Sequence, residues 1–419
     1  MVAMYLRGNK WNMSKRPRRR SSTWRIILLL VLIGAALYVN QVVVPATPPL
    51  FVPTPTPTRS PESFVNQAEE LYKEGKLKPA IEAYKQAIES DPKNPSNYLS
   101  LARLQIFVSD YDSAIVNTQN ALLENPNNAL AYALQGWALG FQGKYSDAEI
   151  ALKRSISIDP NSALAHAFYA EVLVNQGNYD LVSKAIDESK IALSLDPTIL
   201  ETHRARGVVL LNTGNIPQAI DEFKAAIAIN KNIADLHLYL GVAYKANEQY
   251  DLAEESLLAA YALNPTDPVA LTEISRSYFA DGRYQQAAQF AEEAVKVLPS
   301  DPRLHGNLGI MYYKNEEFGK AITQLSLAIH GGTLNGNINV EGLPLDYDRT
   351  MEYYWYYGFS LAKSNRCGEA VPVAQALLNG VPNDETAVYN ANAILQICQE
   401  NQNTPAANTD NQETATPEP

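Results

Sequence analysis

A period of 34 residues constrains the fold of this chain more than any other feature of its sequence. An alanine recurs in steps of 34 residues, interrupted by one step of 37 and one of 49, at Ala80, Ala114, Ala148, Ala185, Ala219, Ala253, Ala287, Ala321 and Ala370. In most periods a small residue stands twelve positions before this alanine and a proline twelve positions after it. We call these nine residues the register alanines, and their regularity predicts a repetitive architecture.

One period, residues 234–265, indicates what each unit forms. Its first part carries apolar residues at helical spacing around Gly241, and after a polar elbow a second set follows from Ala253 to Ala260. Pro265 cannot continue a helix and ends the unit. The small residues let the two helices pack closely, but one helix pair cannot bury its apolar face alone. Successive pairs are therefore expected to stack.

This helix–turn–helix pattern resembles the tetratricopeptide repeat family. In the first unit the residues that fit the family pattern are Phe64, Ala68, Leu71, Ala80, Tyr84, Ala87 and Pro92. Nine such units, numbered here as repeats 1–9, begin at Pro61, Pro95, Ala129, Ala163, Leu200, Ala234, Pro268, Pro302 and Met351. The resemblance implies an all-α fold: a right-handed α-solenoid of about nine repeats. A capping helix is expected after the repeats, near residues 384–399, with Asp384 as its N-cap.

The N-terminal segment predicts a membrane anchor. Residues 1–25 hold eight basic residues and no acidic one, and residues 26–44 are an apolar stretch long enough to span a bilayer as one helix. The basic flank predicts a cytoplasmic N-terminus, with the rest of the chain extracytoplasmic. The alternative is a cleaved signal peptide, with a small-x-small site at residues 44–46, which would release a secreted or periplasmic structural or assembly factor.

Composition divides the remainder of the chain. Residues 45–61 are rich in proline and threonine and predict an extended linker, residues 61–400 the solenoid, and residues 400–419 a disordered tail. Three extra residues in repeat 4, near Tyr179, predict a longer elbow. An insertion at 330–350 separates repeats 8 and 9, and its Asn-Gly pair at 335–336 predicts either a hairpin or a plain surface loop.

Charge and motifs narrow the function classes. The net charge is −11, and removing the eight basic residues of the N-terminus leaves 26 basic and 45 acidic residues, a net −19. Such an acidic body argues against a nucleic-acid ligand. The sequence has no phosphate loop, nucleophile elbow or dinucleotide fingerprint, so we expect neither an enzyme nor a cofactor. A remote alternative is an enzyme that uses the 330–350 insertion.

The histidines and cysteines are the residues in this sequence best suited to bind a metal or form a disulfide. Four of the five histidines, His166, His203, His237 and His305, share position 4 of their repeats, which predicts a structural role and no metal site. Cys367 begins the second helix of repeat 9 and Cys398 lies near the end of the last helix. Antiparallel packing would bring them together, and an extracytoplasmic location permits a disulfide. The alternative is two buried free thiols.

The family resemblance also implies a binding face. In that family the first helix of each repeat lines the concave side, and positions 5, 9 and 12 share a face of that helix. A protein or peptide partner is therefore expected to contact aromatic and arginine side chains at these positions, since such residues dominate binding hot spots. They are Arg103, Trp137, Arg204, Arg276, Phe279, Tyr313, Trp355 and Phe359. The alternative is that tight stacking buries some of them.

Overall fold

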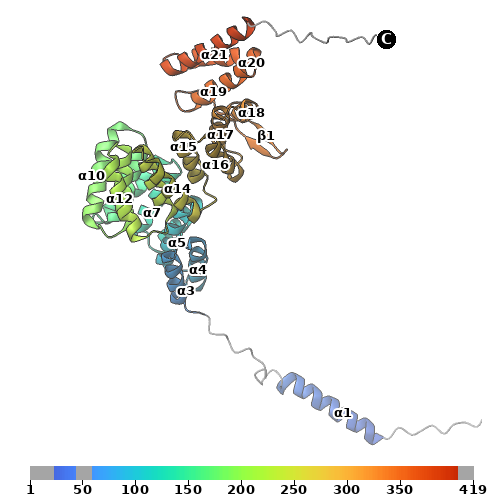
Figure 1. Cartoon of the computed structure of the whole chain (residues 1–419). Coiled ribbons are helices and arrows are strands. Elements are labelled where there is room, and N and C mark those ends of the chain that lie inside the picture. The colour runs from blue at the N-terminus through green and yellow to red at the C-terminus, as the bar shows by residue number, and fades with distance from the viewer. Residues whose placement is uncertain (1–22, 44–58, 404–419) are drawn as a thin grey trace, which may run out of the picture. The chain divides into compact units, whose positions relative to one another are not determined.

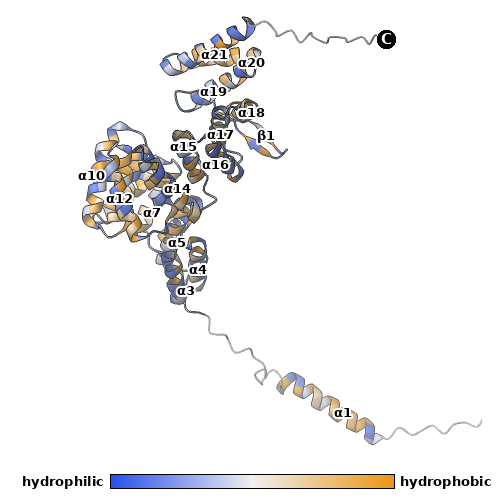
Figure 2. Ribbon diagram, viewed as in Figure 1, coloured by the Kyte–Doolittle hydropathy of each residue, from blue (hydrophilic) through white to orange (hydrophobic). Residues whose placement is uncertain are grey.

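The computed structural model describes residues 23–43 and 59–403. Contacts between residues divide the chain into two units, with the boundary between Arg59 and Ser60. In the first unit, helix α1 (Thr23–Tyr38) continues into a short π-helical segment, η1 (Val39–Val43). Apolar residues cover α1, and all of its residues are exposed (Figure 2). Its length and composition fit a membrane span and equally fit a signal sequence.

The second unit is the predicted solenoid. Within residues 59–403 the structure contains nine antiparallel helix pairs and one final helix. The first helices of the pairs are α3 Pro61–Lys73, α5 Pro95–Phe107, α7 Ala129–Phe141, α9 Ala163–Asn175, α11 Leu200–Asn212, α13 Ala234–Ala246, α15 Pro268–Ala280, α17 Pro302–Lys314 and α19 Thr350–Lys363. Eight of these nine helices begin at the residue predicted from the repeat.

The second helices lie antiparallel to the first. They are α4 Leu77–Ser90, α6 Tyr111–Glu124, α8 Tyr145–Ile158, α10 Tyr179–Leu195, α12 Ile216–Ile229, α14 Tyr250–Leu263, α16 Tyr284–Val297, α18 Phe318–His330 and α20 Cys367–Gly380. The prediction of a longer elbow in repeat 4 is wrong. The extra residues lengthen α10, because a helix absorbs three residues with nearly one additional turn of hydrogen bonds.

Close packing within each pair depends on the register residues. All nine register alanines are fully buried. At Gly241 an added Cβ would lie 2.6 Å from Cγ of Leu257, so any side chain there would force the two helices of repeat 6 apart. The recurrent small residues are therefore a direct requirement of the helix pair.

The insertion forms a small hairpin, which is one of the two conformations predicted for it; the other was a plain surface loop. Strand β1 (Gly332–Leu334) pairs antiparallel with β2 (Ile338–Val340). The turn residues Asn335 and Gly336 both have positive φ angles, 49° and 77°, which suit an Asn-Gly turn. Beyond it, Leu343 and Leu345 pack against the core of the last repeats.

The solenoid ends with helix α21 (Glu385–Asn403). The Asp384 carboxylate accepts a 2.7 Å hydrogen bond from the Ala387 backbone N–H, which confirms the predicted cap. Ala391 and Ile394 of α21 are fully buried against repeat 9. This helix therefore covers the apolar end that the last repeat would otherwise expose.

Repeats 1–6 form a superhelical turn that closes on itself. Helices α3–α14 gather into one compact group, whereas α15–α21 continue beyond it (Figure 1). The Asn232 amide reaches the carbonyl of Lys73 at 2.9 Å, and Arg103 Nε donates to Glu201 at 2.6 Å. These contacts join residues 159 and 98 positions apart in sequence. The closure determines which parts of the inner face remain accessible.

Candidate functional site

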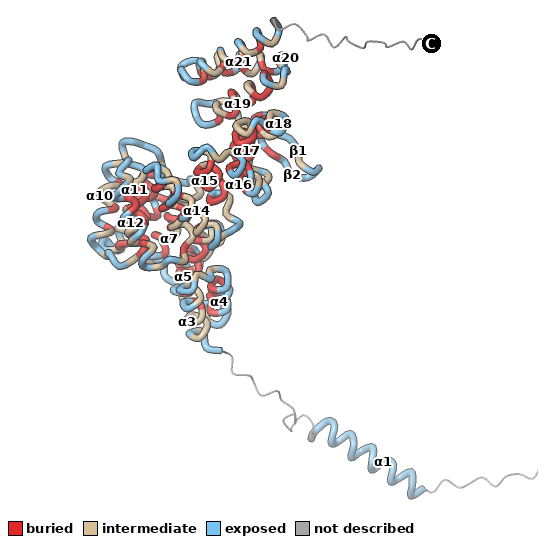
Figure 3. Tube along the Cα trace, in the orientation of Figure 1, coloured by how far each residue is buried: buried red, intermediate tan, exposed pale blue. Residues whose placement is uncertain are grey.

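Three of the eight residues predicted to line a binding face are buried in the solenoid. The exposed fractions of Trp137, Arg204 and Trp355 are 2%, 0% and 8%. In the first part of the solenoid the buried segments lie among α7, α11 and α12 (Figure 3). The prediction that these three side chains line an accessible groove is therefore wrong, because tight stacking encloses them.

Trp137 belongs to an aromatic group inside the closed turn. Its ring stacks on Phe168 with centroids 4.2 Å apart and meets Phe107 edge-on at 5.7 Å. Its indole Nε1 donates a 2.9 Å hydrogen bond to the Glu171 carboxylate. Every polar and apolar part of this indole thus has a partner within the chain.

Arg204 is the centre of a buried ion network. Its guanidinium pairs with Glu171 and with Asp235, the latter at 2.7 Å, and lies 5.3 Å from the ring of Trp137 and 5.0 Å from that of Tyr239. Burial raises the pKa of Glu171 despite this arginine. Burial would lower the pKa of Arg204, but the carboxylates of Asp235 and Glu171 raise it well above its usual value. The inner face of repeats 3–6 is thus filled by the chain's own charges.

The sequence contained a signal for this network that the prediction did not use. Glu171 occupies position 9 of repeat 4, on the face assigned to the groove, and it is 2% exposed. Glu201, which pairs with Arg103, is fully buried. A carboxylate on the same face as several arginines predicts internal ion pairs, since a buried charge requires a partner.

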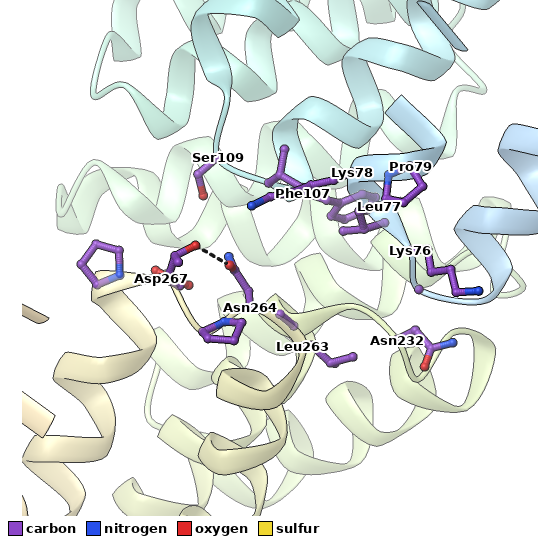
Figure 4. A pocket seen from close by; sticks show the side chains of 16 residues that line it. Lys76, Leu77, Lys78, Pro79, Phe107, Ser109, Asn232, Leu263, Asn264 and Asp267 are labelled. Carbon is purple, nitrogen blue, oxygen red and sulfur yellow. Dashed lines mark hydrogen bonds between the residues drawn. The ribbon is translucent and has the colours of Figure 1, made fainter. Parts of the chain in front are cut away.

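A cavity lies where the superhelical turn closes. It measures about 410 Å³ and is bounded by the elbows at 75–79 and 107–109 and by the inter-repeat turns at 232–234 and 263–268 (Figure 4). Asp267 faces it, and its carboxylate accepts a 2.9 Å hydrogen bond from the Val269 backbone N–H. Burial raises the pKa of Asp267. None of the eight predicted groove residues lines this cavity.

Repeats 7–9 instead bring aromatic side chains together on half-buried surface. Tyr313 of α17 lies 6.2 Å from Phe359 and 5.0 Å from Tyr356, both of α19, measured between ring centroids. Lys314 Nζ lies 6.0 Å from the Phe279 ring and 5.8 Å from the Tyr356 ring. We call Phe279, Tyr313, Lys314, Tyr356 and Phe359 the aromatic cluster. Three of its members were predicted from the sequence; Lys314 and Tyr356 were not.

The charged residues near the aromatic cluster differ in their partners. Arg276 donates a 2.6 Å hydrogen bond to Glu273, and Lys245 pairs with the same carboxylate. These two cations together lower the pKa of Glu273, although its burial opposes them. Within residues 59–403, Lys314 has no carboxylate at ion-pair distance, and its ammonium lies near the rings of Phe279 and Tyr356. The cluster can therefore attract an acidic group.

The position-4 histidines make structural hydrogen bonds. Rings of His166, His203 and His305 contact the carbonyl of the proline six residues earlier, at 2.9–3.0 Å. Through their other nitrogen, His166 and His203 contact Glu188 and Glu222, at 2.5 and 2.6 Å. Those two hydrogen bonds raise the pKa values of both histidines. In the part of the chain that the structure describes, no group of three His, Cys, Asp or Glu residues could hold a metal ion.

The two cysteines form a disulfide at the end of the solenoid. Cys367 and Cys398 have Cα atoms 5.4 Å apart, and the bond links the start of α20 to the later part of α21. The Asn401 side-chain amide donates to the Ala362 carbonyl at 2.9 Å nearby. The disulfide therefore fastens the capping helix to the last repeat.

Comparisons with known proteins match the repeat region. The family model described as "TPR repeat" matches residues 68–105, and the one described as "Tetratricopeptide repeat" matches residues 99–163, 133–181, 204–268 and 272–332. No curated protein matches the chain.

Solved structures resemble the fold. The hetero-tetramer Cut9–Hcn1 of the APC/C is 16% identical with a TM-score of 0.55, over 81% of this chain and 78% of that chain. PilF of Pseudomonas aeruginosa is 20% identical with a TM-score of 0.39, over 47% and 88%. A tetratricopeptide repeat protein from Parabacteroides merdae is 15% identical with a TM-score of 0.42, over 66% and 99%. At 16% identity, the similarity to the Cut9–Hcn1 structure shows that the two share a solenoid fold and shows nothing about function.

Proposed function

Because the chain belongs to the tetratricopeptide repeat family, we propose that it is a non-catalytic scaffold that binds a protein segment at the aromatic cluster of repeats 7–9. We place this scaffold on the extracytoplasmic side of a membrane, anchored by α1. Repeats of this kind serve as protein-interaction surfaces, so the question for this chain is which surface is available.

The contrast between the two parts of the inner face carries the proposal. In repeats 3–6 the predicted groove residues Trp137 and Arg204 are buried among their partners within the chain and offer no exposed surface to a ligand. In repeats 7–9, Phe279, Tyr313 and Phe359 are only half-buried. Half-buried aromatic side chains supported by their neighbours are typical of binding hot spots, because they offer a large contact area at little entropic cost.

The charge at the cluster suggests the chemistry of the partner segment. Lys314 is held against the rings of Phe279 and Tyr356, and carboxylates of the chain do not neutralise it within residues 59–403. An incoming segment with an apolar side chain and an adjacent Asp or Glu would satisfy both the rings and the ammonium. Arg276, already paired with Glu273, would contribute less.

The anchor rests on length and charge. The apolar span Thr23–Val42 is 20 residues long and, at about 1.5 Å per residue, matches a hydrocarbon core of roughly 30 Å. The basic residues before it favour an N-terminus that stays in the cytoplasm. N-terminal sequencing of the mature protein tests the anchor. A mature start near Thr47 would favour the alternative, a secreted or periplasmic assembly factor.

Capture by the full-length chain tests the binding face. Proximity labelling with the wild type would identify bound proteins, and Lys314→Glu together with Phe359→Ala should reduce their recovery by at least about tenfold, because hot-spot truncations commonly cost more than ~1 kcal/mol. Lys296→Glu is the matched control, since Lys296 is exposed and forms a salt bridge with Glu293 away from the aromatic cluster. Equal recovery with both variants would refute the assignment to repeats 7–9.

A further inference from the structure

The outer face of repeats 2 and 3 departs from the pattern of the other repeats. The residue two positions after each register alanine is exposed in all nine repeats. In seven of them it is polar or a proline: Glu82, Asp187, Asp221, Glu255, Gln289, Thr323 and Pro372. In repeats 2 and 3 it is Val116 and Ile150, exposed by 53% and 69%. Large parts of these two β-branched apolar side chains thus face solvent where the other repeats carry a polar residue or a proline.

Each of these two residues lines a furrow between successive second helices. Val116 lines a furrow of about 530 Å³ with walls from α4 and α6 and a floor from α5. Ile150 lines one of about 600 Å³ with walls from α6 and α8 and a floor from α7. The furrows are equivalent: Gln105, Ser113, Val116 and Asn117 in the first correspond to Leu139, Asp147, Ile150 and Ala151 in the second.

The ridge between the furrows is also apolar. Leu123 lies on α6, seven residues after Val116, and is 80% exposed. Residues seven apart lie on the same side of a helix, about two turns or roughly 10 Å from each other. Val116, Leu123 and Ile150 are therefore three exposed apolar side chains on the outer face of repeats 2 and 3, which we call the outer patch.

The charges around the outer patch are unbalanced. Glu89 and Asp112 line the first furrow and Asp147 the second, and within residues 59–403 none of the three pairs with a lysine or arginine. Of the cations in the two furrows, Lys85 in the first is already paired with Glu82, and Arg154 in the second donates a 3.1 Å hydrogen bond to the side-chain oxygen of Asn127. The exposed apolar side chains of the patch therefore have an excess of carboxylates beside them, with Glu89, Asp112 and Asp147 against the single arginine Arg154. Those carboxylates would repel the same surface of a second copy of the chain.

We propose that the outer patch binds an amphipathic helix of another protein, with apolar residues on one face and lysine or arginine on its flanks. Each furrow is open on its outer side, so a helix that lies across α6 and α8 can place apolar side chains in both furrows. Apolar side chains two turns apart on that helix, roughly 10 Å, match the spacing of successive repeats. This site is separate from the aromatic cluster of repeats 7–9 and does not depend on the function proposed for it.

Peptide binding to the full chain in zwitterionic nanodiscs tests the proposal. The probe is a fluorescent helical peptide with Leu at i, i+3 and i+7 and Lys on both flanks; empty nanodiscs give the background. We expect Val116→Gln with Ile150→Gln to weaken binding at least about tenfold, because both apolar anchors are lost. Val269→Gln is the matched control, since Val269 is 56% exposed outside the furrows, and it should change affinity less than about twofold.

Two further measurements make the result decisive. Asp112→Asn with Asp147→Asn should lower the affinity for the Lys-flanked peptide several-fold. A matched peptide with Glu in place of Lys should bind the wild type much less tightly than the Lys-flanked peptide does. Equal binding by the wild type and the Val116/Ile150 variant, or equal binding of the two peptides, would overturn the proposal. Dimerisation of the wild type in sedimentation velocity that the Val116/Ile150 variant abolishes would assign the patch to a second copy and also overturn it.

Discussion

The side-chain amide of Asn232 donates a 2.9 Å hydrogen bond to the backbone carbonyl of Lys73, 159 residues earlier in the chain. Gly75 lies in the same contact: a Cβ added there would be 2.3 Å from Cβ of Asn232. The turn between repeats 5 and 6 thus touches the elbow of repeat 1. In most solenoids a repeat contacts only its neighbours, so this contact and the Arg103–Glu201 pair add cooperativity between distant repeats.

The contact predicts different effects for two glycine substitutions. Gly75 and Gly143 both adopt positive φ angles, 76° and 72°, but no atom lies within 4 Å of a Cβ built at Gly143. Gly143→Ala should cost only backbone strain, about 1–2 kcal/mol. Gly75→Ala should lower the free energy of unfolding by a further ~1–3 kcal/mol, because Asn232 must move. Denaturant titrations of both full-length variants measure the difference; equal losses would mean that the turn does not close here.

The buried ion network predicts a large cost for removing one partner. Arg204→Met should lower the free energy of unfolding by about 3–5 kcal/mol, because it leaves the Glu171 carboxylate buried without its arginine. Adding Glu171→Gln should restore much of this loss, since a neutral amide can still accept the Trp137 hydrogen bond. Arg154→Met, at an exposed arginine, is the control. A double variant no more stable than Arg204→Met would contradict this account of the network.

Local features of the fold were predictable from the sequence. The register alanines and inter-repeat prolines gave the helix starts, because helix packing and helix termination depend on residues close in sequence. The bond between Cys367 and Cys398 followed from the antiparallel packing of their helices. A hydrogen-bond donor recurs at position 4, and its role could also have been predicted. Tyr98, like His166, donates to the carbonyl of the proline six residues earlier.

The closure of the turn was not predictable in the same way. It results from small rotations summed over five repeats, and no single unit encodes it. The closure buries Trp137 and Arg204, which the sequence pattern had assigned to an accessible groove. The assignment was wrong because tryptophan and arginine are common in buried networks as well as on binding surfaces. The three extra residues of repeat 4 were likewise ambiguous, because a loop and a longer helix accommodate the same insertion.

The disulfide predicts a local loss of stability at the C-terminus. Replacing both cysteines by serine should destabilise the docking of α21 by up to about 3–4 kcal/mol, the chain-entropy value for a closed loop of this length, 31 residues. Hydrogen exchange should then rise in α21 and α20, while repeats 1–6 keep their protection. Unchanged exchange in α21 would show that Ala391, Ile394 and their contacts hold the helix without the bond.

The two histidine–carboxylate pairs predict a pH dependence with a definite sign. The Glu188 and Glu222 carboxylates raise the pKa values of His166 and His203 in the folded chain. Each pair therefore adds its full contribution to the free energy of unfolding below the unfolded-state histidine pKa of about 6.5. This contribution is lost as pH rises through the higher pKa of the folded state. Between pH 6 and 9 the free energy of unfolding should fall further in the wild type than in His166→Gln with His203→Gln. The difference should be roughly 1.5–3 kcal/mol per charged hydrogen bond at most.

His305→Gln is the control, because His305 faces the neutral amide of Gln324. Parallel pH profiles for the wild type and the double variant, measured by denaturant titration, would contradict the assigned role of these two pairs.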